Sequence, residues 1–102
     1  MTTVRQACRH VRSKNAGPFW VTVDFFFHDR QSFDKFVGSQ SLSADNIGRI
    51  MHADPDLVRH YPVPDLNVLK ISYPRSSPQG GVVERDMHSG QQYVRLLDLS
   101  LD

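Results

Sequence analysis

The sequence has little cysteine and no long apolar run, and these two absences exclude several classes of protein. Cys8 is the single cysteine among 102 residues, which excludes an intrachain disulfide and the cysteine-rich zinc motifs. No stretch approaches the roughly 20 apolar residues of a membrane-spanning helix. The N-terminus has charges but no apolar core of a signal peptide. We therefore expect a reducing, cytoplasmic environment, no membrane contact, and Cys8 as a small buried side chain.

An excess of charge of one sign is also missing. Twelve lysines and arginines stand against eleven aspartates and glutamates, which gives a formal net charge of +1. No basic stripe with interleaved aromatic residues is present, so we expect no nucleic-acid partner. Five histidines occur, but without HExxH, His-x-His or a carboxylate cluster at ligand spacing. The sequence thus predicts neither a metal site nor a cofactor.

The strongest structural signal lies in residues 19–27, FWVTVDFFF. β-branched and aromatic residues alternate there with a period of two, which predicts a strand. Its second face carries Trp20, Asp24 and Phe26, so we expect the strand to be internal and this face to be partly covered, in part by an interface. Asp24 needs a partner if it is covered. The alternative is an exposed strand position.

The remaining segments predict a single domain over residues 1–102. The spacing of Val4, Ala7, Cys8 and Val11 predicts an N-terminal helix, followed by a loop that ends at residue 17. Residues 18–102 then form a sandwich. Its further elements are two helices with Asp29 and Ser43 as N-caps, and strands around 57–63, 67–74 and 97–101. This order is typical of a ferredoxin-like split βαβ fold of the α+β class, with a four-stranded antiparallel sheet and helices on one face.

Residues 12–17, RSKNAG, are the first candidate site, and two interpretations of them remain open. A loop before a strand can present backbone N–H groups and two cations to an anion, and glycine allows a close approach. A helix C-terminus is the alternative, because cations complement the helix dipole and glycine makes the turn. The first interpretation assigns a catalytic role to Lys14 and substrate binding to Arg12, Ser13, Asn15, Ala16 and Gly17.

The second candidate site is the polar segment DMHSGQQ, residues 86–92. Asp86 and His88 could form an oriented carboxylate–imidazole pair for acid–base catalysis, with Gln91 and Gln92 binding substrate. The alternative is a polar loop whose amides satisfy backbone groups.

Three segments, RSKNAGPF, DMHSGQQ and LLDLSL, together resemble a small domain of unknown function. It is usually encoded beside, or fused behind, the large acyclic terpene utilisation protein AtuA. The resemblance spans about residues 11–101 and departs at His88, where a tyrosine is expected. It implies a ferredoxin-like fold and the small subunit of a two-component enzyme. The implied chemistry is that of a lyase or hydratase acting on a carboxylate or acyl-CoA.

The resemblance predicts a hetero-oligomer in which this chain lends an anion-binding loop to a site shared with a larger AtuA-like catalytic subunit. The ligand would be an anionic small-molecule substrate. Two other functions remain open. The chain could be a non-catalytic subunit that stabilises or oligomerises its partner through the sheet, or a free-standing regulatory domain that binds a small molecule.

Overall fold

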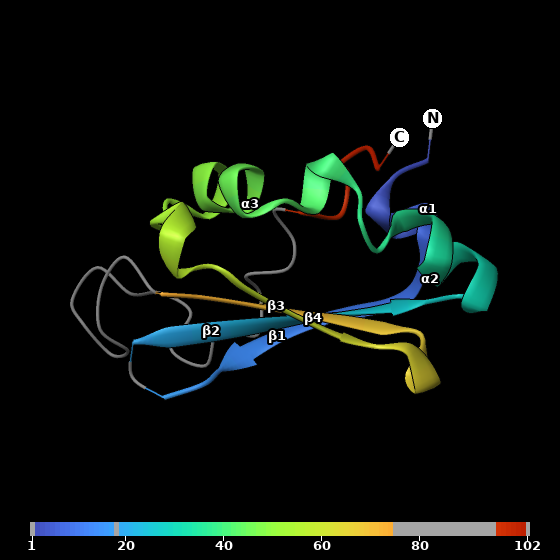
Figure 1. Ribbon diagram of the computed structural model, residues 1–102, viewed down its shortest axis with the longest axis horizontal. Coiled ribbons are helices and arrows are strands. Elements are labelled where there is room, and N and C mark those ends of the chain that lie inside the picture. The colour runs from blue at the N-terminus through green and yellow to red at the C-terminus, as the bar shows by residue number, and fades with distance from the viewer. Residues whose placement is uncertain (1, 18, 75–95, 102) are drawn as a thin grey trace.

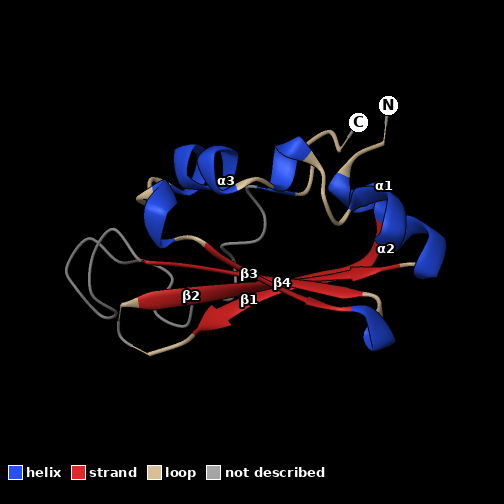
Figure 2. Ribbon diagram, in the orientation of Figure 1, coloured by secondary structure: helices blue, strands red, loops and turns tan. Residues whose placement is uncertain are grey.

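The computed structural model describes residues 2–17, 19–74 and 96–101, which form an α+β fold. Four antiparallel strands lie in the order β1-β2-β4-β3. The α-helices lie on one side of this sheet (Figures 1 and 2). The strands are β1 (Cys8–Asn15), β2 (Trp20–Phe27), β3 (Arg59–Val63) and β4 (Val68–Pro74), and the helices are α1 (Val4–Ala7), α2 (Arg30–Phe36) and α3 (Ala44–Met51).

Strand β2 is internal, as its apolar pattern predicts, because it pairs with β1 on one side and with β4 on the other. Its helix-side residues Val21, Val23, Phe25 and Phe27 are all buried in the core. Alternation along the strand places these side chains against the helices and the intervening ones on the opposite face.

The segment from β2 to β4 forms the predicted split βαβ unit. Strands β2 and β3 both pair antiparallel with β4, which lies between them, so they run parallel to each other. Helices α2 and α3 connect them and begin at the predicted N-caps, Asp29 and Ser43. Strand β3 is an edge strand, as expected from Pro62, which has no N–H to donate to a second neighbour.

The predicted N-terminal helix is wrong beyond its first turn. Helix α1 is one turn with an N-terminal capping box between Thr3 and Gln6. Strand β1 begins directly after the helix, at Cys8. Val11 fits both patterns, because a strand also buries it, opposite Phe25. Pairing with the most apolar strand of the chain outweighs the helical spacing. Residues 8–15 therefore belong to the sheet rather than preceding it.

The closing strand predicted at 97–101 is not part of the four-stranded sheet. Ser100 makes an isolated antiparallel bridge with Thr3, and the Val4 N–H donates to the Leu99 carbonyl at 2.9 Å. The outer position beside β2 is already taken by β1. The C-terminal leucines instead contribute to the core on the helix side, where Leu96 and Leu101 are buried.

Gly48 in α3 is required by a close approach of the following loop. A Cβ atom there would lie 2.7 Å from the Ala53 carbonyl oxygen and 3.2 Å from the Pro55 nitrogen, both backbone atoms. We expect Gly48→Ala to destabilise the fold by about 1–3 kcal/mol despite alanine's better helix propensity, because backbone must move. Gly38→Ala is the matched control, since nothing lies within 4 Å of its added Cβ. Urea denaturation measures both, and equal stabilities would contradict this packing.

Cys8 is buried, as the sequence predicts, and burial raises the pKa of its thiol to about 12. The thiol therefore stays protonated at pH 8 in the folded chain, whereas a solvated cysteine titrates at about 8.5. We expect the folded protein to react with a disulfide reagent far more slowly than the urea-unfolded protein. Rapid, complete labelling of the folded protein would contradict this expectation.

Candidate functional site

The face of the sheet opposite the helices, here called the second sheet face, carries the exposed side chains of Arg12 and Lys14 from the first predicted site. The strand register places its residues, since paired residues share a face. The three α-helices of the described chain lie on the opposite side, and the blue turn drawn below the sheet in Figure 2 is the short 3-10 helix Pro64–Leu66 between β3 and β4. It comprises His10, Arg12 and Lys14 of β1, Trp20, Thr22, Asp24 and Phe26 of β2, Val68, Lys70 and Ser72 of β4, and Arg59, Tyr61 and Val63 of β3.

A buried carboxylate lies at the centre of this face. Asp24 is only 1% exposed. Its Oδ1 accepts a hydrogen bond from Lys70 Nζ at 3.2 Å, and its Oδ2 lies 3.9 Å from Arg12 Nε. The register places these residues side by side across β1, β2 and β4. The expectation that a covered Asp24 needs a partner is confirmed, and the alternative of an exposed position is wrong.

Phe26 on the same face is half-buried, as expected, and cationic side chains of the chain itself lie against it. The guanidinium carbons of Arg9 and Arg12 lie 5.6 and 5.5 Å from its ring centroid. The His10 ring lies 5.6 Å away, centroid to centroid. These contacts account for the partial cover of Phe26 without an interface.

Positive charge exceeds negative charge on the second sheet face, although the whole chain carries only +1. Among its described residues, Asp24 is the one acidic side chain, and it is already paired with two cations. The remaining charge favours acidic ligands or surfaces. The cations of this face are Arg12, Lys14, Arg59 and Lys70, and the guanidinium of Arg9 lies beside them over the Phe26 ring.

The structure divides the residues predicted for the RSKNAG site. Both interpretations of this segment as a loop or a helix end are wrong for residues 12–15, which belong to β1. Arg12 and Lys14 lie together on the second sheet face and are exposed. Ser13 and Asn15 alternate to the helix side, where Ser13 is buried. A strand cannot present all four side chains to one anion.

The last two residues of this segment form the turn between β1 and β2. Gly17 has φ 93°, in the region that favours glycine, and the Ala16 N–H donates to the Trp20 carbonyl at 2.9 Å. Gly17 is thus explained by the hairpin turn. The second predicted site, with Asp86, His88, Gln91 and Gln92, lies outside the described residues.

The sequence interpretation missed a polar row that crosses all four strands. Lys14 pairs with Thr22, Thr22 with Ser72, and Ser72 with Arg59. The hydroxyl oxygens of Thr22 and Ser72 are hydrogen-bonded at 3.0 Å. Two cations therefore lie at the edges of the sheet with two hydroxyls between them. The polar alternation within each strand was visible in the sequence, but the pairing of strands 50 residues apart was not.

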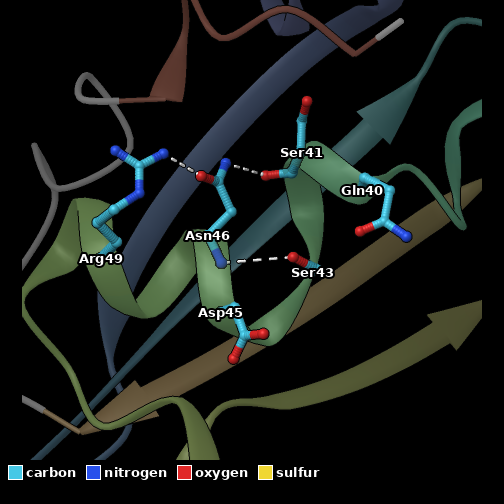
Figure 3. A pocket seen from close by; sticks show the side chains of 6 residues that line it. All are labelled: Gln40, Ser41, Ser43, Asp45, Asn46 and Arg49. Atoms are coloured by element: carbon cyan, nitrogen blue, oxygen red, sulfur yellow. Dashed lines mark hydrogen bonds between the residues drawn. The ribbon is translucent and has the colours of Figure 1, made fainter.

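A cavity of about 480 Å³ lies beside the N-terminus of α3 (Figure 3). Its polar groups mainly satisfy one another. The side-chain Nδ2 of Asn46 donates to the Ser41 carbonyl at 2.6 Å, and the backbone N–H of Asn46 donates to Ser43 Oγ. Arg49 donates to Asn46 Oδ1. These bonds cap and brace the helix, so they are explained without a ligand.

Neither a metal-binding cluster nor a membrane-spanning helix is found among the described residues. Within them, no group of three or more His, Cys, Asp or Glu side chains is placed to hold a metal ion. His60, one of the five histidines, instead lies with Nε2 at 2.6 Å from the Leu42 carbonyl oxygen. None of the helices in the described ranges is long and apolar enough to cross a bilayer.

Fold and site together define a small α+β domain with a cationic sheet face. The chain belongs to the family described as domain of unknown function DUF4387, whose family model matches residues 4–100. The predicted membership of a family of unknown function is confirmed, whereas the association with AtuA remains a prediction. Searches of curated proteins and of solved structures find no match.

The pairing of Asp24 with Lys70 predicts a stability effect. In Lys70→Met, only Arg12 remains beside a carboxylate that is almost fully buried. We expect a loss of about 1–3 kcal/mol in the free energy of unfolding, less than for a fully buried pair because the Lys70 and Arg12 side chains are partly exposed.

Lys14→Met is the matched control, because Lys14 lies on the same face but is paired across the strands with Thr22. We expect it to change stability by under about 0.5 kcal/mol. Thermal or urea denaturation of both variants provides the comparison. A Lys70→Met protein as stable as Lys14→Met would show that the Asp24 contact contributes nothing measurable.

Proposed function

We propose that this chain is the small subunit of a two-component AtuA-type enzyme, docked on a larger catalytic subunit through the second sheet face. The observation that supports this most is the pair of exposed cations, Arg12 and Lys14, on a face with excess positive charge. Such a surface can contribute to a site for an anionic substrate, here a carboxylate or an acyl-CoA. The reaction class that we propose is that of a lyase or hydratase.

Arg12 is suited to bind an anion because its side chain is held from one side. Its Nε lies near Asp24 and its guanidinium carbon lies over Phe26, so these contacts orient the guanidinium while its side chain stays 58% exposed. A guanidinium can bind a carboxylate or phosphate through two parallel hydrogen bonds.

Lys14 contributes a point charge to the proposed site from the next position on the same face of β1. An ammonium group there would polarise a carbonyl or stabilise developing negative charge. Proton transfer would fall to Asp86 and His88 or to the larger subunit. Ser13 and Asn15 have no part in the proposal, because they lie on the helix side.

A non-catalytic structural subunit is the second candidate, and exposed aromatic residues favour it. Tyr61 on this sheet face is 52% exposed, and Phe19, in the turn directly before β2, is 56% exposed. Aromatic side chains are enriched where protein surfaces associate. This candidate needs the same docking face but no contribution of Arg12 or Lys14 to chemistry.

The test is co-purification of the full chain with an AtuA-like protein from the same source, which the resemblance predicts to be encoded beside it. Kinetics of the complex are then measured on branched and carboxylated acyl-CoA thioesters. We expect Arg12→Ala to lower kcat/KM by roughly ten- to a hundredfold, as for a lost charge-assisted contact. Arg12→Lys should restore only part of the activity, because the planar fork is lost.

Arg30→Ala on α2 is the matched control, since Arg30 is paired with Asp34 on the helix surface. It should leave the kinetics unchanged. Unchanged kinetics of Arg12→Ala in an intact complex would favour the structural subunit. The absence of any complex would contradict both candidates.

A further inference from the structure

A second cavity, of about 350 Å³, opens on the second sheet face. It lies away from Arg12, toward the strands β4 and β3. Its size is at the lower end of the range for small-molecule sites, which is roughly 300–1,000 Å³. The described residues that line it are Ala16, Trp20, Arg59, Tyr61 and Ser72.

The strand register places three of the lining residues on three neighbouring strands. Ser72 lies on β4, while Trp20 and Tyr61 lie on the strands to either side, β2 and β3. Trp20 pairs with Pro74 and Tyr61 pairs with Lys70, so the two aromatic residues lie on opposite sides of Ser72 along β4. Their backbones are roughly 16 Å apart, from two strand spacings across and four residues along the strand. Both side chains line the cavity, so a flat or compact apolar group in it would contact them, with the serine hydroxyl beneath it.

Arg59 is the one charged side chain among the described lining residues, and two backbone carbonyls orient it. Its Nη1 donates to the Asp56 carbonyl at 2.8 Å and to the Val58 carbonyl at 3.4 Å. An arginine oriented in this way loses little freedom when it binds an anion. Among the described residues that line the cavity, none is acidic.

We infer that this cavity binds a small organic oxyanion, a carboxylate or a phosphate ester, whose body is flat or compact and apolar. Arg59 would bind the oxyanion through its guanidinium. Ser72 Oγ would donate a further hydrogen bond to the ligand while it accepts one from Thr22 Oγ1, because either hydroxyl of that pair can be the donor. Trp20 and Tyr61 would contact the apolar body. A cationic ligand is disfavoured, because Lys70 and Lys14 lie on the same face as Arg59.

This inference goes beyond the proposed function, because it assigns a binding site to this chain alone and requires no larger subunit. Trp20 is the single tryptophan of the sequence and lines the cavity, so its fluorescence reports on occupancy. The two proposals can fail separately. A chain that forms no complex could still bind the anion, and a chain that binds no anion could still form the complex.

The test is a fluorescence titration of the full chain with four probes of similar shape: benzoate, phenyl phosphate, benzamide and benzylamine. We expect saturable changes with benzoate or phenyl phosphate, and at least roughly tenfold weaker binding of neutral benzamide and cationic benzylamine. The stronger of the two anions identifies a carboxylate or a phosphate site. Equal binding of benzoate and benzamide, or no saturable binding of either anion, would overturn the inference.

Two variants locate the binding site. Arg59→Gln should weaken binding of the preferred anion at least roughly tenfold, whereas Arg49→Gln, a cation beside the other cavity, should not change it. Tyr61→Leu keeps the charge but removes an aromatic side chain, so it should weaken binding while the preference for anions remains. A thermal melt of each variant verifies folding, and anion binding that survives Arg59→Gln in a folded protein would contradict the site.

Discussion

The pairing of β2 with both β1 and β4 determines the rest of the structure. This strand carries large apolar side chains on one face and a mixture of aromatic and polar side chains on the other. The two ladders fix which residues of β1 and β4 accompany each face. A slip of one residue would exchange the two faces and bring Asp24 into the helix-side core. The cationic face and the core are thus two results of one register.

Asp24 is the residue whose environment depends most on this register. A buried carboxylate is unfavourable unless charged or polar partners replace its water. In the observed register Arg12 and Lys70 flank it from both neighbouring strands. In a slipped register, its neighbours would be the apolar residues of the core. The ion pairs therefore contribute to the specificity of strand pairing, in addition to whatever net stability they provide.

The sequence predicted the elements whose signals are local. Strand β2 was visible from its alternation, and α2 and α3 from their caps at Asp29 and Ser43. Strand β1 was missed because Val11 fits both a helical and a strand period, and only long-range pairing decides between them. For the same reason Arg12 and Lys14 were identified from a motif, whereas Lys70 and Arg59 were not. The proximity of Lys70 and Arg59 to the cations of β1 depends on the pairing of β2 with β4, whose paired residues are about 50 positions apart in the chain.

The polar row from Lys14 to Arg59 connects the two proposed sites on the second sheet face. It crosses all four strands, so its two ends lie roughly 14 Å apart at the usual strand spacing. This distance exceeds the Debye length of roughly 8 Å at physiological ionic strength, so solvent-exposed charges at the two edges are largely screened from each other. The charges of Arg12 and Lys14 therefore have little electrostatic influence on a small anion beside Arg59. Coupling between them would have to act through the Thr22–Ser72 hydroxyl pair and the strands beneath it.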